Sequence, residues 1–341
     1  MKTTMKQIAE ACGVSVSLVS RIINGDKSLK CKPETREKVL KQIEESRFVP
    51  DYHAQRLANH SIKQNKDIRI GYISYKGVDR MPNPYFDKII EGITTILAEE
   101  EYTVKRFYID EVASLYRKKI PLADKPFDGL ILFGNVPDDL VEYLRQQTKY
   151  LSSVYGDEIP DADFVGSDIV STINIVVDYI KKMGYSEIGL ALGSDEMRTK
   201  ALLEYAAKNG ISIDENFTFE GMNNFGTAYR IMSEKLKSNK PPKLICCMND
   251  EMALGVINAL LDSGYSVPND VSVTGHDDIA RSSYGKVPLT TVRIYKEEIG
   301  RLVSDLLLER INYKRKFPVK VFVPCDLVVR KSVKRFNREG K

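Results

Sequence analysis

The segment TTMKQIAEACGVSVSLVSRIING, residues 3 to 25, decides the fold of the N-terminal part of the chain. Thr4 is followed three residues later by Gln7, which is the spacing of a capping box at the start of a helix. Apolar side chains then recur at helical spacing, at Ile8, Ala11 and Cys12. These features predict a first helix over residues 5 to 12, which ends in a turn at Gly13.

Two further helices are predicted after that turn. The second covers residues 16 to 23, and Ser15 can cap it because a serine hydroxyl accepts a hydrogen bond from a free backbone N–H. Its predicted inner face holds Val19, Ile22 and Ile23. The third covers residues 33 to 46, with Pro33 at an allowed first-turn position. Its predicted inner face holds Val39, Leu40 and Ile43, which completes a helix-turn-helix unit with a small core.

The pattern changes after this unit. Asp51 can cap one short helix in DYHAQRLANHS, and the polar linker SIKQNKD follows at residues 61 to 67. From Ile68 onward, apolar strands alternate with amphipathic helices. The predicted strands are IRIGYIS, TVKRFYI, GLILFG, EIGLALG, KLICCMN and VSVTGHD, and the predicted helices cover residues 84 to 100, 197 to 209 and 250 to 263. This alternation predicts an α/β fold of parallel sheets with helices on both faces.

The length of 341 residues indicates two or three domains, at about 150 residues per domain. The predicted divisions are an all-α head over residues 1 to 50, a hinge helix and linker over 51 to 67, and a two-lobed core over 68 to 341. Within the core, we assign about 68 to 166 and a crossover segment of about 292 to 322 to the N-lobe, and about 167 to 291 and 323 to 335 to the C-lobe. Ligands of such folds bind beyond the carboxyl ends of the strands.

Charge is distributed unevenly along the chain. Residues 1 to 66 carry 13 Lys/Arg against 7 Asp/Glu, whereas the remainder carries 38 against 40. A basic excess confined to the head favours a nucleic-acid partner, since phosphates attract Lys and Arg. The alternative is an ordinary solvated face.

Several functional classes lack their sequence signals. The hydrophobic content is 43%, without an apolar run long enough to span a bilayer, and the opening MKTTMKQIAEACGVS does not resemble a secretory signal. The five cysteines form no CxxC pair and there are three histidines, so we expect neither a metal site nor a cofactor. GxGxxG after a strand, GxxxxGK[ST], GxSxG and HExxH are all missing. Asp277 and Asp278 are adjacent at a strand end and point in different directions, so we expect no enzyme.

The chain resembles the lactose-repressor and galactose-repressor family over essentially its whole length. The head segments IAEACGVSVSLVSRIING (8 to 25) and ETREKVLKQIEESRFVP (34 to 50) carry the most specific match. In the core, MNDEMALGVINAL, PNDVSVTGHDD and PLTTVRI are similar to the family's second lobe. The resemblance implies a periplasmic-binding-protein-like core. TVRI and the ending VFVPCDLVVRKS look closest to regulators of galactose and β-galactoside use.

The second helix of the head is expected to read DNA. A helix enters the major groove with its N-terminal side chains near the base edges. The resemblance implies that Val16 and Ser17 choose the half-site sequence, and Arg21 offers a fork suited to guanine. The alternatives are that Ser17 is a simple surface residue and that Arg21 contacts phosphate. Phosphate positioning is expected from Thr4, Ser15, Ser20 and Asn24.

The segment AQRLA, which begins at Ala54, resembles the family's hinge helix, whose leucine enters a minor-groove base step. Leu57 would be that wedge, because an apolar side chain offsets part of the cost of separating stacked bases. The alternative is that Leu57 packs against the head. Asp51 replaces the asparagine usual in the family, and an acid there weakens phosphate contact unless it caps the helix.

Matching motifs in the core imply the effector site. Arg198, Asn249 and Asp277 each follow a strand, and they offer the bidentate polar groups that adjacent sugar hydroxyls need. Alternatively, Asn249 or Asp277 caps a helix, and Arg198 pairs with Glu196 or Glu204. Tyr85 and Phe86 match a ligand-facing pair of the family, although an aromatic pair at a helix start is often core.

Two positions depart from the family pattern. Many members carry an aromatic ring two residues after Gly221, where this chain has Asn223, and Phe225 is the candidate replacement. The aspartate often found after the strand LSSVY is poorly aligned here, with Asp157 as the nearest candidate.

The sequence therefore predicts a sequence-specific DNA-binding transcriptional repressor of a sugar-utilisation operon, released or modulated by a small sugar, with the galactose and β-galactoside class favoured. The expected partners are a pseudopalindromic double-stranded operator and a second copy of the chain, without a membrane. The ending FNREGK lacks heptads, which favours a dimer over a tetramer. The expected location is the cytoplasm, at the nucleoid when operator-bound. The alternatives are a sugar receptor core with no DNA role, or a regulator that responds to a non-sugar ligand such as a nucleobase.

Overall fold

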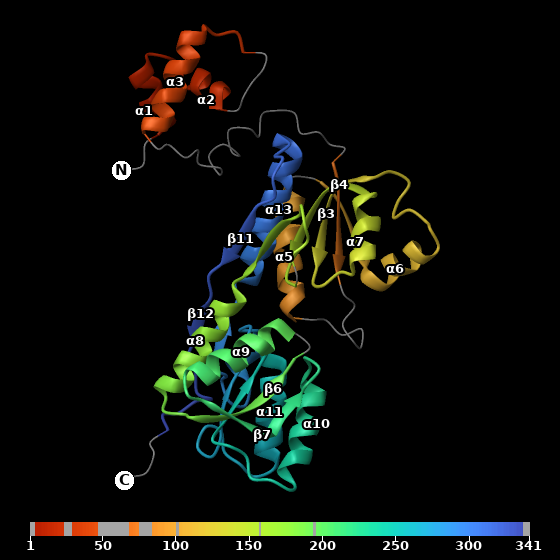
Figure 1. Ribbon diagram of the computed structural model, residues 1–341, viewed down its shortest axis with the longest axis vertical. Coiled ribbons are helices and arrows are strands. Elements are labelled where there is room, and N and C mark those ends of the chain that lie inside the picture. The colour runs from red at the N-terminus through yellow and green to blue at the C-terminus, as the bar shows by residue number, and fades with distance from the viewer. Residues whose placement is uncertain are drawn as a thin grey trace. The chain divides into compact units, whose positions relative to one another are not determined.

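The computed structural model of the chain describes residues 4–23, 29–46, 68–74, 84–99, 102–156, 158–193 and 196–336. The chain divides into two compact units, Met1–Asn65 and Lys66–Lys341 (Figure 1). The predicted hinge and linker over residues 51 to 67 lie outside the described residues.

The first unit contains the three predicted helices. They are α1 (Met5–Cys12), α2 (Val16–Ile23) and α3 (Pro33–Glu45). The capping box at the start of α1 is confirmed, because the Gln7 N–H donates to Thr4 Oγ1 at 3.3 Å and the Thr4 N–H donates to Gln7 Oε1 at 2.8 Å. Gly13 ends α1 with a φ of +70°, in the left-handed region where glycine avoids the Cβ clash. The helix-turn-helix prediction is confirmed.

The core of the head differs from the sequence prediction at two positions. Its buried apolar side chains are Ile8, Ala9, Cys12, Val19, Ile22 and Val39. Leu40 was predicted to face inward and is 49% exposed, since one residue further along α3 rotates the side chain by about 100° away from Val39. Similarly, Ala9 is buried where the spacing favoured Ala11, which is exposed.

The second unit begins with a six-stranded parallel sheet that we call the N-lobe sheet. Its order is β11-β5-β4-β3-β1-β2. The strands are β1 (Arg69–Ser74), β2 (Thr103–Tyr108), β3 (Phe127–Phe133), β4 (Thr148–Val154), β5 (Asp163–Ser167) and β11 (Lys320–Val323).

Helices cover both faces of this sheet, as predicted. They are α5 (Pro84–Glu99) and α13 (Lys296–Tyr313) on one face and α6 (Ile109–Arg117) and α7 (Asp138–Arg145) on the other (Figure 1). Strand β3 shows the reason, because Ile131 and Phe133 pack in the cluster with α5 and α13 while Leu130 and Leu132 pack in the cluster with α6 and α7. Alternate side chains of a buried strand serve opposite faces.

A four-stranded parallel sheet of order β7-β6-β8-β9 forms the C-lobe. Its strands are β6 (Glu187–Leu192), β7 (Ser212–Glu220), β8 (Leu244–Cys247) and β9 (Ser272–Thr274). The helices are α8 (Ile169–Lys182), α9 (Glu196–Lys208), α10 (Phe225–Leu236), α11 (Asp250–Asp262) and α12 (Arg281–Tyr284). An antiparallel pair, β10 (Thr291–Arg293) and β12 (Asp326–Val328), completes this part. The α/β prediction is confirmed.

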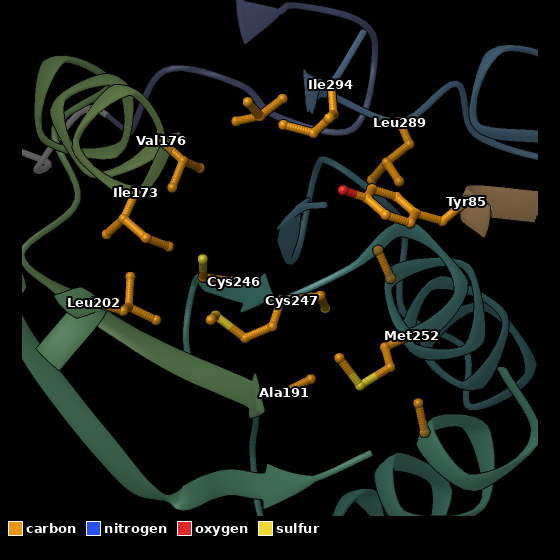
Figure 2. Packing of buried hydrophobic residues seen from close by; sticks show 14 of the residues in the cluster. Tyr85, Ile173, Val176, Ala191, Leu202, Cys246, Cys247, Met252, Leu289 and Ile294 are labelled. Carbon is orange, nitrogen blue, oxygen red and sulfur yellow. The ribbon is translucent and has the colours of Figure 1, made fainter. Parts of the chain in front are cut away.

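The core of the C-lobe surrounds the end of β8, where Cys246 and Cys247 are buried (Figure 2). Burial raises the pKa of the Cys246 thiol to about 11, which keeps it protonated. The ring of Tyr85 extends from α5 toward this region in Figure 2. Among the described residues there is no cluster of potential metal ligands, and no helix that is both long and apolar enough to cross a bilayer.

Helix α13 joins the two lobes, since it follows β10 and leads into β11. Its backbone lies directly against that of α5. A Cβ added to Gly92 would lie 2.1 Å from the Glu297 carbonyl oxygen, and one added to Gly300 would lie 2.1 Å from the Ile89 carbonyl oxygen. Both contacts require glycine, so α5 and α13 form a close-packed pair.

Candidate DNA-binding face and effector site

The predicted DNA-reading side chains lie on the outer face of α2. Val16 is 43% exposed, and Ser17 and Arg21 are also exposed, whereas Val19 and Ile22 are buried on the opposite face. Ser17 and Arg21 are four residues apart and therefore share one side of the helix. This arrangement presents a hydroxyl and a guanidinium together to the surroundings.

The predicted phosphate-positioning residues are more varied. Thr4 caps α1, and Ser15 Oγ accepts a hydrogen bond from the Leu18 N–H at 3.2 Å at the start of α2. Ser20 is half-buried. Asn24, Ala54 and Leu57 lie outside the described residues, so their roles stay predictions.

The candidate effector residues of the core gather at the carboxyl ends of the strands. Tyr85 lies in the first turn of α5, the helix after β1 of the N-lobe, while Arg198, Asn249 and Asp277 follow β6, β8 and β9 of the C-lobe. Within each of the two parallel sheets these ends lie along one edge, where ligands bind in such folds. Asp157 lies outside the described residues.

A cavity of about 340 Å³, counting the solvent at its mouth, lies between the lobes. It is lined by Tyr85, Ile89, Tyr155, Gly156, Phe164, Gly166, Ser167, Ile169, Arg198 and Ile299. Of the sequence candidates, Tyr85 and Arg198 line it. Tyr155 was missed, although an aromatic residue directly after the strand LSSV was the available signal. Within it, the space that water-sized molecules can occupy is about 20 Å³, because the larger figure includes open solvent.

Aromatic rings form the N-lobe side of the cavity. The ring centroids of Tyr85 and Tyr155 lie 5.7 Å apart, and Phe86 packs edge-on against both rings, at 5.3 Å from Tyr85 and 5.6 Å from Tyr155. Phe86 also contacts Phe133 at 6.0 Å, so this ring belongs to the core as well as to the site. The edge-to-face geometry fixes the ring orientations.

Arg198 faces this aromatic group from the C-lobe. It is 6% exposed, its Nη1 donates to the Met248 carbonyl oxygen at 3.2 Å, and its guanidinium lies 6.0 Å from the Tyr155 ring centroid. Its proposed alternative partner Glu204 instead lies 3.9 Å from Lys200. A buried guanidinium beside a cavity is suited to hold ligand oxygens.

Asn249 is the N-cap of α11, as the alternative interpretation predicted. Its Oδ1 accepts a hydrogen bond from the Met252 N–H at 2.8 Å, and its Nδ2 donates to the Asn223 carbonyl oxygen at 3.2 Å. Asn223 is exposed with a φ of +56°. Phe225 stacks on Tyr229 with ring planes 4° apart. The Phe225 ring is therefore already packed against its own helix.

His276 and Asp277 form a buried pair after β9. The His276 Nδ1 lies 3.0 Å from Asp277 Oδ1, and Asp277 is 7% exposed. Burial, together with the positive charge of Arg198, lowers the pKa of His276. The imidazole is therefore neutral and carries its proton on Nδ1, because the carboxylate can only accept. This hydrogen bond fixes the orientation of the Asp277 carboxylate.

Asp250, the first residue of α11, is fully buried and is a polar residue that the sequence did not single out. Its carboxylate accepts hydrogen bonds from Ser282 Oγ at 2.5 Å, Thr291 Oγ1 at 2.6 Å and the Ile279 N–H at 2.9 Å. Burial, and next the nearby charge of Asp277, raise the pKa of Asp250 to about 7.

The neighbouring carboxylate of Asp278 points elsewhere. It accepts hydrogen bonds from Arg293 at 2.7 Å and Arg330 at 2.6 Å. Burial alone would raise the pKa of Asp278, but the two arginines lower it overall. Adjacent aspartates thus serve two different networks, which agrees with the expectation that they are not an acid and base pair.

Comparison with known proteins identifies both parts of the chain. Residues 4–51 match the family of bacterial regulatory proteins of the lacI type, and residues 177–333 match the periplasmic binding protein-like domain. The HTH-type transcriptional repressor MelR of Bacillus subtilis is 30% identical, over 96% of this chain and 96% of its own.

Two solved structures share the fold. One is a complex of the transcriptional regulator CelR with cellobiose, with a TM-score of 0.67 at 23% identity over 97% of this chain and 100% of that one. The other is a lac repressor dimer bound to operator and the anti-inducer ONPF, with a TM-score of 0.65 at 22% identity over 98% and 100%. With a helix-turn-helix head, a two-lobed core and a full-length repressor relative, this chain belongs to the lacI family of bacterial transcriptional repressors.

Proposed function

We propose that the chain is a homodimeric, cytoplasmic repressor of a sugar-utilisation operon and that a small sugar in the interlobe cavity releases it from its operator. The galactose and β-galactoside class is favoured by the TVRI segment and the C-terminal motif. The sugar proposal rests on the two unlike sides of the cavity, one aromatic and one cationic. Tyr85 and Tyr155 offer an apolar face for a pyranose ring, and Arg198 offers hydrogen-bond donors for hydroxyl oxygens.

Asp277 adds the acceptor that hydroxyl donors need. Its carboxylate is held by His276, and Asp277 follows a strand of the same sheet as Arg198 does. A carboxylate can accept two hydroxyl hydrogen bonds, which discriminates a polyol from an apolar ligand. The similar fold solved with cellobiose supports this assignment.

On the DNA side, the exposed face of α2 carries the proposal. Ser17 and Arg21 would contact base edges in the major groove, with Val16 beside them. Two heads in a dimer would match a pseudopalindromic operator. Leu57 remains the proposed minor-groove wedge of the hinge. The effector would act by differential affinity for the two lobe arrangements.

A mobility-shift assay tests the function directly. The full chain is mixed with promoter DNA from its own gene neighbourhood and with random DNA of equal length, with and without galactose, lactose, cellobiose, ribose and glucose. The proposal expects a shift specific for the promoter DNA that one sugar of the panel reverses. A specific shift that responds to none of the sugars contradicts the sugar assignment, and equal binding of random DNA contradicts operator recognition.

A further inference from the structure

The turn that carries Asp277 has an unusual backbone. Asp277 has a φ of +118° and Asp278 a φ of +51°, both in the region that non-glycine residues rarely adopt. Such conformations cost free energy and persist only where surrounding contacts hold them. The Asp277 N–H donates to the Val292 carbonyl oxygen at 2.8 Å, which fixes one side of the turn.

Lys296 fixes the other side. Its Nζ donates to the carbonyl oxygens of Asp277, of Asp278 at 3.4 Å and of Ile294 at 3.2 Å. The residue is 7% exposed, so its ammonium group depends on these three acceptors in place of water. Lys296 therefore binds the backbone of the turn, whereas the Asp277 carboxylate contacts His276 at 3.0 Å.

Lys296 is also the first residue of α13, and this helix packs in the N-lobe against α5. The next residue, Glu297, has its carbonyl oxygen so close to Gly92 of α5 that only glycine fits there. The Nζ of Lys296 lies 5.9 Å from the ring centroid of Tyr85, near the start of α5. Lys296 thus connects the turn to the start of a close-packed helix pair.

We infer that Lys296 is the positioning residue that couples the Asp277 turn of the C-lobe to the α5 and α13 pair of the N-lobe. Through this residue, sugar bound at the turn changes the position of the helix pair. The inference rests on the proposed function, in which Asp277 binds the effector. Coupling of this kind is a difference in free energy between two arrangements, separate from the affinity of the ligand itself.

Lys296→Met tests the coupling. This variant keeps an unbranched apolar side chain that is one atom shorter and removes the three N–H donors of the ammonium group. Sugar binding is measured by calorimetry, and operator release is measured by fluorescence anisotropy at saturating sugar. We expect release to fall to less than about one tenth of the wild-type extent, with operator affinity unchanged and sugar binding still detectable. A residue that only supports the site would weaken sugar affinity, and excess sugar would then restore full release.

Lys88→Met is the matched control. Lys88 is an exposed lysine of α5 that pairs with Glu297 at 3.4 Å and is not bonded to the turn, so this variant should respond as the wild type does. Lys296→Gln retains amide donors and should recover part of the release.

Amide hydrogen exchange of the wild-type chain supplies a readout that requires no variant. Sugar should alter protection in the first turns of both α13 and α5, together with the 277 to 278 turn. If protection changes in the turn alone, or if Lys296→Met releases operator fully, the coupling role is overturned while the effector site stands. If the wild-type chain binds none of the panel sugars, the proposed function itself fails.

Discussion

The head and the core present their candidate functional residues in opposite ways. On α2 the side chains of Ser17 and Arg21 are exposed, and the buried residues of that helix are apolar. In the core, Arg198 and Asp277 are buried and hydrogen-bonded to their own lobe before any ligand arrives. The proposed DNA-binding residues are therefore exposed to solvent, whereas the proposed effector residues are held in place by contacts within the fold.

This difference predicts how separable function and stability are in each region. A substitution on the exposed face of α2 leaves the buried apolar side chains of the head in place, so we expect it to affect the proposed DNA contacts more than the fold. A substitution in the cleft leaves a buried partner without its hydrogen bond, which costs about 1–3 kcal/mol and more for a charged group. Variants of α2 should therefore change DNA affinity more than stability, whereas variants of the cleft should change both sugar affinity and stability.

Arg21→Ala should have the largest effect. A bidentate arginine–guanine contact contributes about 1–3 kcal/mol, and a dimer makes it twice, so specific operator affinity should fall by at least about 30-fold. The melting temperature of the core should not change, since Arg21 is exposed in a separate compact unit. Fluorescence anisotropy with promoter DNA measures the first and calorimetry the second.

Lys41→Ala, which removes an equal charge from α3, controls for loss of general electrostatic attraction. If this control loses as much affinity as Arg21→Ala, base recognition by Arg21 is ruled out.

Asp277→Asn should abolish the response to sugar at concentrations that release the wild type, while operator binding survives. An asparagine accepts fewer hydrogen bonds and cannot balance the local charge, so we expect sugar affinity to fall by about 10- to 100-fold. Titration of sugar into a preformed complex with promoter DNA checks this, and Arg198→Ala should behave in the same way. Release of DNA by both variants at the wild-type sugar concentration shows that the cleft residues are misassigned.

The pH dependence of stability should report Asp250. The group titrates near 3.9 in the unfolded chain and at about 7 in the folded chain, so the folded chain retains the proton between these values. Its stability contribution therefore falls as pH rises from about 4 and is lost once pH passes 7, with about 1.4 kcal/mol of the loss between pH 6 and pH 8. Urea unfolding should show this decline in the wild type and a smaller decline in Asp250→Asn.

Asp270→Asn is the control for that measurement, because hydrogen bonds from Ser266 lower the pKa of Asp270 and move it further from this window. Equal pH profiles for the wild type and Asp250→Asn would contradict the raised pKa of Asp250.

Thr4→Ala should have the smallest effect and should be confined to the head. Loss of an N-cap costs about 0.5–2 kcal/mol. The capping box of Thr4 and Gln7 stabilises only α1, so hydrogen exchange should accelerate in the head and stay unchanged in the core. Thr4→Ser, which keeps the hydroxyl, should preserve the wild-type protection. Acceleration in the core would show that the two units do not unfold independently.

The local sequence pattern predicted the helices and strands, but it did not predict which side chains are covered when these elements pack together. Strands β1 and β6 follow IRIGYIS and EIGLALG closely because alternation and apolar runs are local properties. Leu40 was predicted on the inner face with Val39 and Ile43, but only the packing of the other two helices decides which of the neighbours Val39 and Leu40 is covered.

The candidate site shows the same limit. Arg198 and Asp277 could be proposed because each follows a strand, and that edge is common to all parallel strands. Asp250, His276 and Lys296 could not, because their significance lies in burial and in partners far along the chain, such as Thr291 for Asp250. Phe225 looked available in the sequence, and only its stacking on Tyr229 shows that it is already packed.

The central claim is that the buried polar groups of the cleft recognise a sugar, and calorimetric titration of the wild-type chain with a panel of mono- and disaccharides tests it most directly. Asp277→Asn is titrated in parallel as the matched variant. We predict saturable binding of at least one galactose-class saccharide at one site per chain, weakened by about 10- to 100-fold in the variant. If a folded wild-type chain binds none of the saccharides, or binds one with equal affinity in Asp277→Asn, the account of this site is contradicted.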